Sequence, residues 1–219
     1  MRKNSQGRES LPTRHKTESD RDAWKVRPLD KEDAGLFLDF FEGRAFADNP
    51  DWKHCYCTFF FRGGNGGSIA GLPARMRRRD QVAALIAEGR MRGLLAFDAE
   101  GRVIGWCNAN RKTAFARLAP FSAGDESVLA IVCFVVDPNS RRRGVSQALL
   151  NGALSEAARE GYAACEARPS SKARTAAGHY HGTPSLYESA GFELVPGGRG
   201  VVRKSLSRGE PRGGLRASH

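Results

Sequence analysis

The sequence lacks long apolar runs, and this absence limits where the protein can reside. No stretch of its 219 residues approaches the roughly 18 to 20 apolar residues with which a helix crosses a bilayer. The first 22 residues are polar and charged, and they lack the apolar segment of a secretory signal peptide. We therefore expect no membrane association and a cytoplasmic location.

Cysteine is scarce, and its spacing excludes a disulfide framework and a zinc site. The five cysteines form an odd set without a signal peptide, so we expect a reducing compartment and free thiols. The segment His54-Cys55-Tyr56-Cys57 lacks both the cysteine spacing and the second ligand pair of a zinc site, so we expect no metal. A catalytic thiol has no support either, because nothing nearby clearly lowers the pKa of these cysteines.

Acidic residues are few relative to basic ones, which leaves a formal net charge of +11. A surplus of this size draws anionic ligands, whether a small molecule or a nucleic acid. The densest basic cluster, Arg75 with Arg77, Arg78 and Arg79, falls on a predicted amphipathic helix over residues 73–88. No known nucleic-acid-binding motif accompanies it, so we favour a solvated helix face over a nucleic acid surface.

The most informative segment is an apolar run over residues 128–136, followed by a basic turn and a helical pattern. The run is rich in β-branched residues and predicts a buried strand, which Asp137-Pro138 ends. The turn contains one glycine, Gly144, and leads directly into the helix. Because the first N–H groups of a helix lack partners and its dipole favours negative charge, the segment predicts a phosphate-binding loop.

The remaining pattern predicts strands that alternate with helices. The helices are expected at residues 30–46, 73–88 and 143–161, with a short one between Pro184 and Gly191. Besides the apolar run, the strands are expected at residues 24–28, 93–98, 103–110, 162–168, 192–195 and 200–206. A parallel pairing of the strand at 162–168 with the apolar run would form a βαβ unit.

The strand, turn and helix resemble the acyl-CoA-binding motif of the GCN5-related N-acetyltransferases. The family's pattern, Gln/Arg-x-x-Gly-x-Gly/Ala, falls here on Arg141, Gly144 and Ser146. The serine departs from the pattern, but it is small. We therefore expect it to let a pyrophosphate approach the backbone, though less freely than glycine would.

A segment near the C-terminus is similar to the same family's second signature, a short helix with Leu-Tyr and then Gly-Phe before a strand. Thr183 and Pro184 are suited to open this helix and Gly191 to end it. The resemblance implies that Tyr187 lies beside the sulfur of coenzyme A and protonates the departing thiolate. Where the family often has asparagine, the sequence has Tyr180, so one usual contact with coenzyme A is in doubt.

The resemblance implies an α/β fold with a mixed (α+β) sheet. A GNAT-like central sheet of about seven strands is flanked by about four helices and splayed between the central strand and its parallel neighbour. We expect one acetyltransferase domain over residues 23–206, a disordered arm at 1–22 and a disordered tail at 207–219.

The implied activity is that of an N-acetyltransferase, with direct transfer from acetyl-CoA to a primary amine in a ternary complex. Pantetheine would pair with the backbone of Phe134, Val135 and Val136, and an N–H near Phe134 or Val135 would stabilise the oxyanion. The pyrophosphate would lie on the N–H groups of the loop residues Arg141, Arg142, Arg143, Gly144, Val145 and Ser146.

The general base and the acceptor are not defined by the resemblance. Glu166 is the first candidate for the base, with Glu126, His179, His181 or a water chain as alternatives. The aromatic loop over residues 48–67 favours a small-molecule amine. Candidate side chains for the acceptor pocket are Trp52, Tyr56 and Trp106, with His54, residues 59–61 and an ammonium-binding Asp48 or Asp51.

Two further readings stay open beside the enzyme. One is a non-catalytic protein that binds acyl-CoA and regulates a partner; the other is a basic nucleic-acid-binding module. The acyl chain, the acceptor amine and the oligomeric state, including a homodimer, are left open by the sequence.

Overall fold

The computed structural model describes residues 24–64, 67–118, 125–170 and 177–206. The arm at 1–22 and the tail at 207–219 lie outside the described residues. Within the described part, one mixed sheet runs in the order β1-β2-β3-β4-β5-β7-β6, and the pairing of β4 with β5 is its parallel one. The strands are β1 (Lys25–Pro28), β2 (Gly93–Phe97), β3 (Val103–Arg111), β4 (Val128–Val136), β5 (Ala164–Ala167), β6 (Glu193–Leu194) and β7 (Val202–Ser205). The expected mixed sheet is confirmed.

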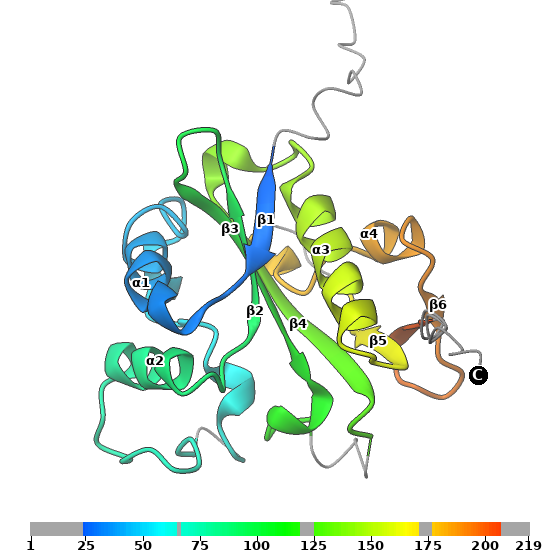
Figure 1. The fold of residues 1–219 in the computed structure, drawn as a ribbon, viewed down its shortest axis with the longest axis horizontal. Coiled ribbons are helices and arrows are strands. Elements are labelled where there is room, and N and C mark those ends of the chain that lie inside the picture. The colour runs from blue at the N-terminus through cyan, green and yellow to red at the C-terminus, as the bar shows by residue number, and fades with distance from the viewer. Residues whose placement is uncertain (1–23, 65–66, 119–124, 171–176, 207–219) are drawn as a thin grey trace, which may run out of the picture.

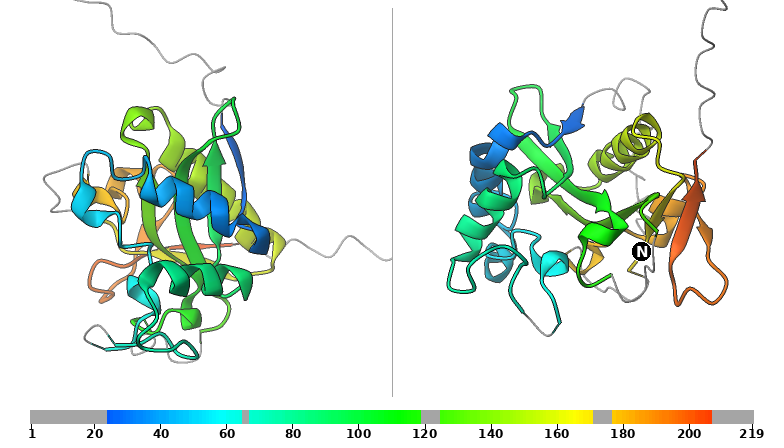
Figure 2. Two further views of the ribbon diagram at one scale, coloured as in Figure 1. Left: turned by 90° about the vertical axis from the view of Figure 1, so that its left-hand side faces the viewer. Right: turned by 60° about the horizontal axis from the view of Figure 1, so that its bottom comes forward.

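Helices cover both faces of the sheet (Figures 1 and 2). On one face lie α1 (Ala34–Glu42) and α2 (Arg78–Ala87), and on the other lie α3 (Val145–Arg159) and the short α4 (Pro184–Glu188). Each face therefore has its own apolar core, and β3 and β4 supply side chains to both. As predicted, α3 connects the parallel strands β4 and β5.

The first two helices are shorter than the sequence predicts. Asp30 caps as expected, in a capping box with Asp33, but a 3-10 turn at Lys31–Asp33 precedes α1, which ends at Glu42 instead of residue 46. The second helix begins at Arg78 instead of residue 73, because Arg77 has the extended backbone of an N-cap residue. The start of α4 agrees with the prediction: the Thr183 side chain accepts the N–H of Leu186 at 3.2 Å, and Pro184 occupies the first turn.

The sheet opens between β4 and β5. Strand β5 pairs with β4 only over Val128–Ile131, although β4 continues to Val136. A register shift opposite Asn108 and Ala109 leaves Val132 without a cross-strand partner on β3. Val132 and the following Cys133 both contribute to the core beneath α1 and α2. This bulge reverses the alternation of β4, so that Phe134 packs in the core beneath α3.

Beyond this point, the loop before α4 takes the place of β5 at the edge of β4. The N–H of Phe134 donates to the carbonyl of Tyr180 at 2.6 Å, and Nδ1 of His181 lies 2.7 Å from the carbonyl of Val132. These bonds satisfy backbone groups that β5 leaves without a partner. The splay implied by the resemblance is therefore present.

Candidate active site

The turn after β4 lines a groove at the start of α3. Gly144 is the N-cap residue with φ of +92°, and no side chain caps the helix. Its left-handed backbone is one that glycine adopts without steric cost. The first N–H groups of α3 therefore face a groove of about 470 Å³, whose lining includes Arg141, Arg142, Gly144, Val145 and Ser146 from the turn and Thr183, Ser185 and Ser189 from α4 and its flanks.

The three arginines of the turn have different surroundings. Arg141 donates through Nε to the carbonyl of Val136 at 3.1 Å and through Nη2 to Asp48 at 3.0 Å, so it connects the end of β4 to the loop after α1. This guanidinium holds the pKa of Asp48 below its usual value. Arg143 lies over the ring of Trp24, 5.1 Å from its centroid. Arg142 lines the groove, and within the described residues it has no ion-pair partner.

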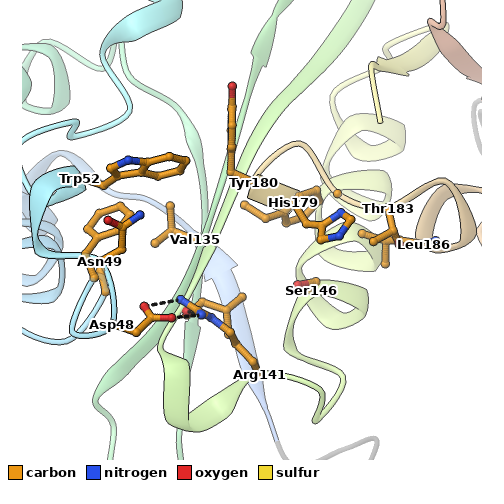
Figure 3. Close-up of a pocket in the computed structure, with 15 residues that line it drawn as sticks. Asp48, Asn49, Trp52, Val135, Arg141, Ser146, His179, Tyr180, Thr183 and Leu186 are labelled. Atoms are coloured by element: carbon orange, nitrogen blue, oxygen red, sulfur yellow. Dashed lines mark hydrogen bonds and ion pairs between the residues drawn. The ribbon is translucent and has the colours of Figure 1, made fainter. Parts of the chain in front are cut away.

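A central cavity of about 210 Å³ lies where β4 and β5 separate (Figure 3). Asp48 and Trp52 lie on one side of it, His179 and Leu186 lie on the other, and Val135 of β4 lies between them. This cavity shares with the groove the residues Val136, Arg141, Ser146, Thr183 and Leu186. Groove and cavity therefore adjoin along the end of β4 and the start of α3.

A third space of about 480 Å³ adjoins the central cavity on its far side from the groove. The two share the residues Phe46, Trp52, Val135 and Tyr180. The lining of the third space is aromatic and basic, with Phe59 and Phe60 beside Arg62, Arg78 and Arg117. We refer to it as the acceptor cavity.

The two predicted catalytic residues lie outside these spaces. Tyr187 is 1% exposed, packs against Phe134 and Phe192, and donates its hydroxyl to the carbonyl of His181 at 2.9 Å. Burial raises the pKa of Tyr187 well above its usual value, so the phenol stays protonated at neutral pH. Glu166 is buried on β5, where it binds Lys112 at 2.7 Å and Arg203 at 2.9 Å. Neither residue belongs to the lining of the groove, the central cavity or the acceptor cavity.

The other three candidate bases differ in their surroundings. Glu126 pairs with Arg111 at 3.1 Å on the surface. His181 is tied to Val132, and burial lowers the pKa of its ring, which keeps it neutral. His179 lines the central cavity, and its Nδ1 is buried without a hydrogen-bond partner in the described part of the chain.

Of the aromatic residues predicted for the acceptor pocket, Trp52, Phe59 and Phe60 line the acceptor cavity together with His54, and Trp52 lies at the boundary shared with the central cavity. Trp106 has no exposed surface and packs edge-on against Phe37 in the core. Tyr56 is 4% exposed, donates to Glu42 at 2.9 Å and does not belong to the lining of the acceptor cavity. The apolar surface of their aromatic rings explains why Trp106 and Tyr56 are buried, because the same kinds of side chain line both cores and ligand pockets.

The sequence analysis missed several residues of the cavities. Tyr180 was noted only as a departure from the family pattern, yet it lies between the central and acceptor cavities and covers the edge of β4. Arg62 and Arg117 carry no recognisable pattern, because each lies in an irregular segment that tertiary structure brings to the cavity. Arg78 is exposed, as expected for a solvated helix face, and it also lines the acceptor cavity as the first residue of α2.

Two features were sought in the described residues, a cluster of metal-ligating side chains and a helix of membrane-spanning length. Within residues 24–64, 67–118, 125–170 and 177–206, no three His, Cys, Asp or Glu side chains are grouped to hold a metal ion. In the same ranges, no helix has the length and apolar character needed to cross a membrane.

The split sheet, together with the uncapped start of α3 beside it, matches the fold of an acyltransferase of the GNAT type. The chain belongs to the acetyltransferase (GNAT) family, whose sequence model matches residues 70–183, just over half of the chain. A comparison of the sequence with curated proteins gave no match.

Solved structures show the same fold at low sequence identity. A GCN5-related N-acetyltransferase from Kribbella flavida has a TM-score of 0.51 at 19% identity, over 84% of this chain and 99% of that chain. A mosquito arylalkylamine N-acetyltransferase-like protein, 5b, has a TM-score of 0.50 at 14% identity, over 84% of this chain and 100% of that chain. YhbS of Escherichia coli, a GNAT family N-acetyltransferase solved with CoA, has a TM-score of 0.47 at 18% identity, over 84% and 81% of the two chains.

Proposed function

We propose that the protein is a cytoplasmic N-acetyltransferase that moves an acetyl group from acetyl-CoA to a primary amine of a small molecule. The observation that carries the proposal is the shared lining of three successive spaces, the groove at α3, the central cavity and the acceptor cavity. Two substrates entering from opposite ends would meet beside Val135, where β4 and β5 separate. Holding two reactants together in this way supplies much of the rate of a direct transfer.

The described residues fit the parts of acetyl-CoA. The N–H groups at the start of α3 and the guanidinium of Arg142 offer positive charge to the pyrophosphate. In the central cavity, the unpartnered Nδ1 of His179 offers a hydrogen bond to a polar group of pantetheine. Acetyl-CoA itself would supply the activated thioester.

The edge of β4 is less open than the resemblance implies. The N–H of Phe134, a candidate for pairing with pantetheine or for the oxyanion, is already donated to Tyr180. Arg141 likewise occupies the carbonyl of Val136. We propose that the carbonyl of Tyr180 releases the N–H of Phe134 when acetyl-CoA binds. That N–H can then donate to the reacting carbonyl.

The role of Tyr187 follows from its hydrogen bond. Its hydroxyl holds the carbonyl of His181, which fixes the turn that carries Tyr180 and leads into α4. We therefore propose Tyr187 as a positioning residue for this turn, with proton donation to the thiolate as the alternative that a kinetic test separates. Glu166 forms ion pairs with Lys112 and Arg203. Proton removal from the amine is therefore left to His179 or to water.

Thermal-shift titration with acetyl-CoA tests the proposal. A ligand that binds only the folded state raises the melting midpoint as its concentration passes the dissociation constant. We expect a shift in the natural chain and its loss in Gly144→Glu, which places a carboxylate at the groove. Gly144→Ala is the matched control, because a Cβ there meets nothing within 4 Å and the backbone strain is the same.

Turnover is then measured as thiol release with a panel of primary amines. Binding without turnover of any amine would favour the non-catalytic acyl-CoA-binding protein. Absence of a thermal shift in a well-folded natural chain would contradict the acetyltransferase proposal.

A further inference from the structure

The acceptor cavity carries an excess of positive charge that the acetyl transfer does not explain. Its lining includes three arginines, Arg62, Arg78 and Arg117, but only one carboxylate, Asp51. An ordinary amine acceptor is itself a cation at neutral pH, so three arginines would repel it unless it also carried a negative group.

These arginines have no carboxylate partners within the described residues. Arg62 donates to the amide oxygen of Gln81, and Arg117 donates through Nε to the carbonyl of Phe59 at 2.9 Å. Within the described part of the chain Arg78 forms no hydrogen bond or ion pair, unlike its neighbours Arg77 and Arg79, which bind Asp80 and Glu42 at 2.9 Å and 2.8 Å. The lining of the cavity therefore retains several guanidinium N–H groups for a ligand.

Neighbouring structure holds the guanidinium groups of Arg62 and Arg117 in place, whereas Arg78 is exposed. The Gln81 amide that binds Arg62 is itself fixed, since its Nε2 donates to the carbonyl of Met76 at 2.8 Å. Arg117 lies over the ring of Phe59, 4.0 Å from its centroid. Burial and the charge of Arg78 both lower the pKa of Arg62, as expected for two cations near each other without a counter-charge.

The start of α2 adds to the positive potential. Arg78 is the first residue of this helix of ten residues, and no side chain caps the helix end. The first N–H groups of α2 therefore contribute partial positive charge on the same side as the arginine. The remaining lining is aromatic, with Phe59, Phe60, Trp52 and Tyr180, which suits an apolar body between two polar ends.

We propose that the acceptor is an amino acid, with its carboxylate bound by Arg62, Arg78 and Arg117 and its amine directed to the boundary at Trp52 and Val135. Guanidinium groups bind carboxylates through paired, charge-assisted hydrogen bonds, which fix direction as well as charge. The inference rests on the proposed acetyl transfer for the orientation of the amine, but the carboxylate site stands on the arginines alone.

The first experiment compares matched acceptors in the presence of acetyl-CoA. Aromatic amino acids and aminoalkanoic acids of increasing length are each measured beside their amides and their decarboxylated amines. We expect kcat/KM to be at least about tenfold higher for the acid than for its amide, as for loss of one charged hydrogen-bonding partner. Equal or better use of the amides and plain amines would overturn the proposal while leaving the acetyltransferase function intact.

The second experiment tests whether the arginines of the acceptor cavity cause the preference for acids over amides. Arg78→Gln removes one charge without breaking a hydrogen bond or ion pair among the described residues, and we expect it to cut the preference for acids about tenfold. Arg78→Lys should restore part of that preference. Arg75→Gln is the matched control, because Arg75 is exposed on the same basic stretch and does not line the cavity. A preference that is unchanged in Arg78→Gln, or equally reduced in Arg75→Gln, would overturn the assignment.

Binding of phenylacetate gives a readout without turnover, since this aromatic carboxylate has no amine to acetylate. Calorimetry on the full chain should detect it in the natural protein and in Arg75→Gln, with a dissociation constant about tenfold weaker in Arg78→Gln. Phenylacetate binding without any acetyl-CoA binding would uphold the anion site and contradict the acetyl transfer. Absence of phenylacetate binding together with no preference for acids would contradict the anion site alone.

Discussion

Single hydrogen bonds hold the turn before α4, and Tyr187, which is 1% exposed, makes one of them. Replacement by phenylalanine keeps the ring contacts with Phe134 and Phe192 but leaves the carbonyl of His181 without its donor. We expect Tyr187→Phe to lower the free energy of unfolding by about 1 kcal/mol, measured by urea denaturation.

Kinetics of the same variant separate the two roles of Tyr187. A positioning role predicts a fall in kcat of less than about tenfold, with the shape of the pH profile unchanged. The pKa of Tyr187 already lies well above its usual value, so its ionisation does not enter the neutral range. A fall of about a hundredfold or more, with stability retained, would make Tyr187 the proton donor instead.

Residue-level prediction from the sequence succeeded where a side chain acts on its own backbone. Asp30, Thr183 and Pro184 were identified as helix starts, and all three occupy those positions, because caps depend on a few neighbouring residues. Trp106 and Tyr56 were assigned to a pocket but lie in the core, since an aromatic side chain alone does not show which apolar surface covers it.

At the level of elements, the start of α1 depends on one buried carboxylate. Asp33 accepts hydrogen bonds from Arg27 at 2.9 Å and from the N–H of Asp30 at 2.8 Å. The hydrogen bond from Arg27 is the main reason that the pKa of Asp33 is lowered. A lowered pKa stabilises the fold above the unfolded value of 3.8, and that contribution is lost as the pH falls through the folded pKa.

We therefore expect Asp33→Asn to reduce the free energy of unfolding at pH 7 by about 1 to 2 kcal/mol, a value that allows for the partial exposure of Arg27. The difference from the natural chain should shrink as the pH is lowered below 4, in denaturant titrations at several pH values. Asp39→Asn, on the exposed face of α1, is the control and should change little. An equal loss of free energy of unfolding at pH 7 and pH 2.5 would contradict the stabilising interaction between Arg27 and Asp33.

The position of α3 depends on a close approach to β3. A Cβ added at Gly105 would lie 2.8 Å from Cγ1 of Val145 and 3.1 Å from Cδ1 of Leu149. We expect Gly105→Ala to displace the start of α3, lowering the free energy of unfolding by about 1 to 3 kcal/mol and weakening acetyl-CoA binding. Gly35→Ala, where a Cβ meets nothing within 4 Å, is the control. Unchanged acetyl-CoA affinity in Gly105→Ala would show that the groove does not depend on this contact.

The sequence was informative about elements but not about their local irregularities. Both bounds of β4 agree with the prediction, because nine consecutive apolar residues mark a strand buried on both faces. The same uniformity conceals the bulge at Val132, since a run without polar residues has no alternation in which a shift is visible. The shortened α1 and α2 have a similar cause, because apolar spacing continues past the residues where the backbone turns.

For the whole molecule, the buried thiols of Cys107 and Cys165, which lie outside the acceptor cavity, provide a measure of how well the core is closed. Burial raises the pKa of Cys165 to about 12, and burial raises the pKa of Cys107 as well. Reaction of these two thiols with a disulfide reagent at pH 8 should therefore be slow in the native chain and fast after unfolding. Rapid reaction of Cys107 or Cys165 in the native chain would show that the core opens readily.

The same thiols make stability depend on alkaline pH. A raised pKa favours the protonated form in the folded state, so its contribution is complete below the unfolded value of 9.0. It is lost as the pH rises toward the folded values. We expect the free energy of unfolding to fall between pH 9 and 11, and Cys107→Ala to reduce that slope in denaturant titrations.

The overall architecture was predictable because the two motifs and the order of elements agree with each other. The arrangement of the acceptor cavity was not, because Arg62, Arg78 and Arg117 come from segments separated in sequence that only the fold brings together.

The hydrogen bond between Phe134 and Tyr180 has a consequence for the kinetics of acetyl-CoA binding. If this bond must open before pantetheine occupies β4, docking becomes a two-step event with an encounter at the α3 groove followed by a rearrangement. The observed rate of acetyl-CoA binding in stopped-flow mixing would then reach a plateau at high acetyl-CoA concentration. The plateau would equal the rate at which the hydrogen bond between Phe134 and Tyr180 opens. Nucleotides truncated before the pantetheine arm, which fill only the groove, would associate without that plateau.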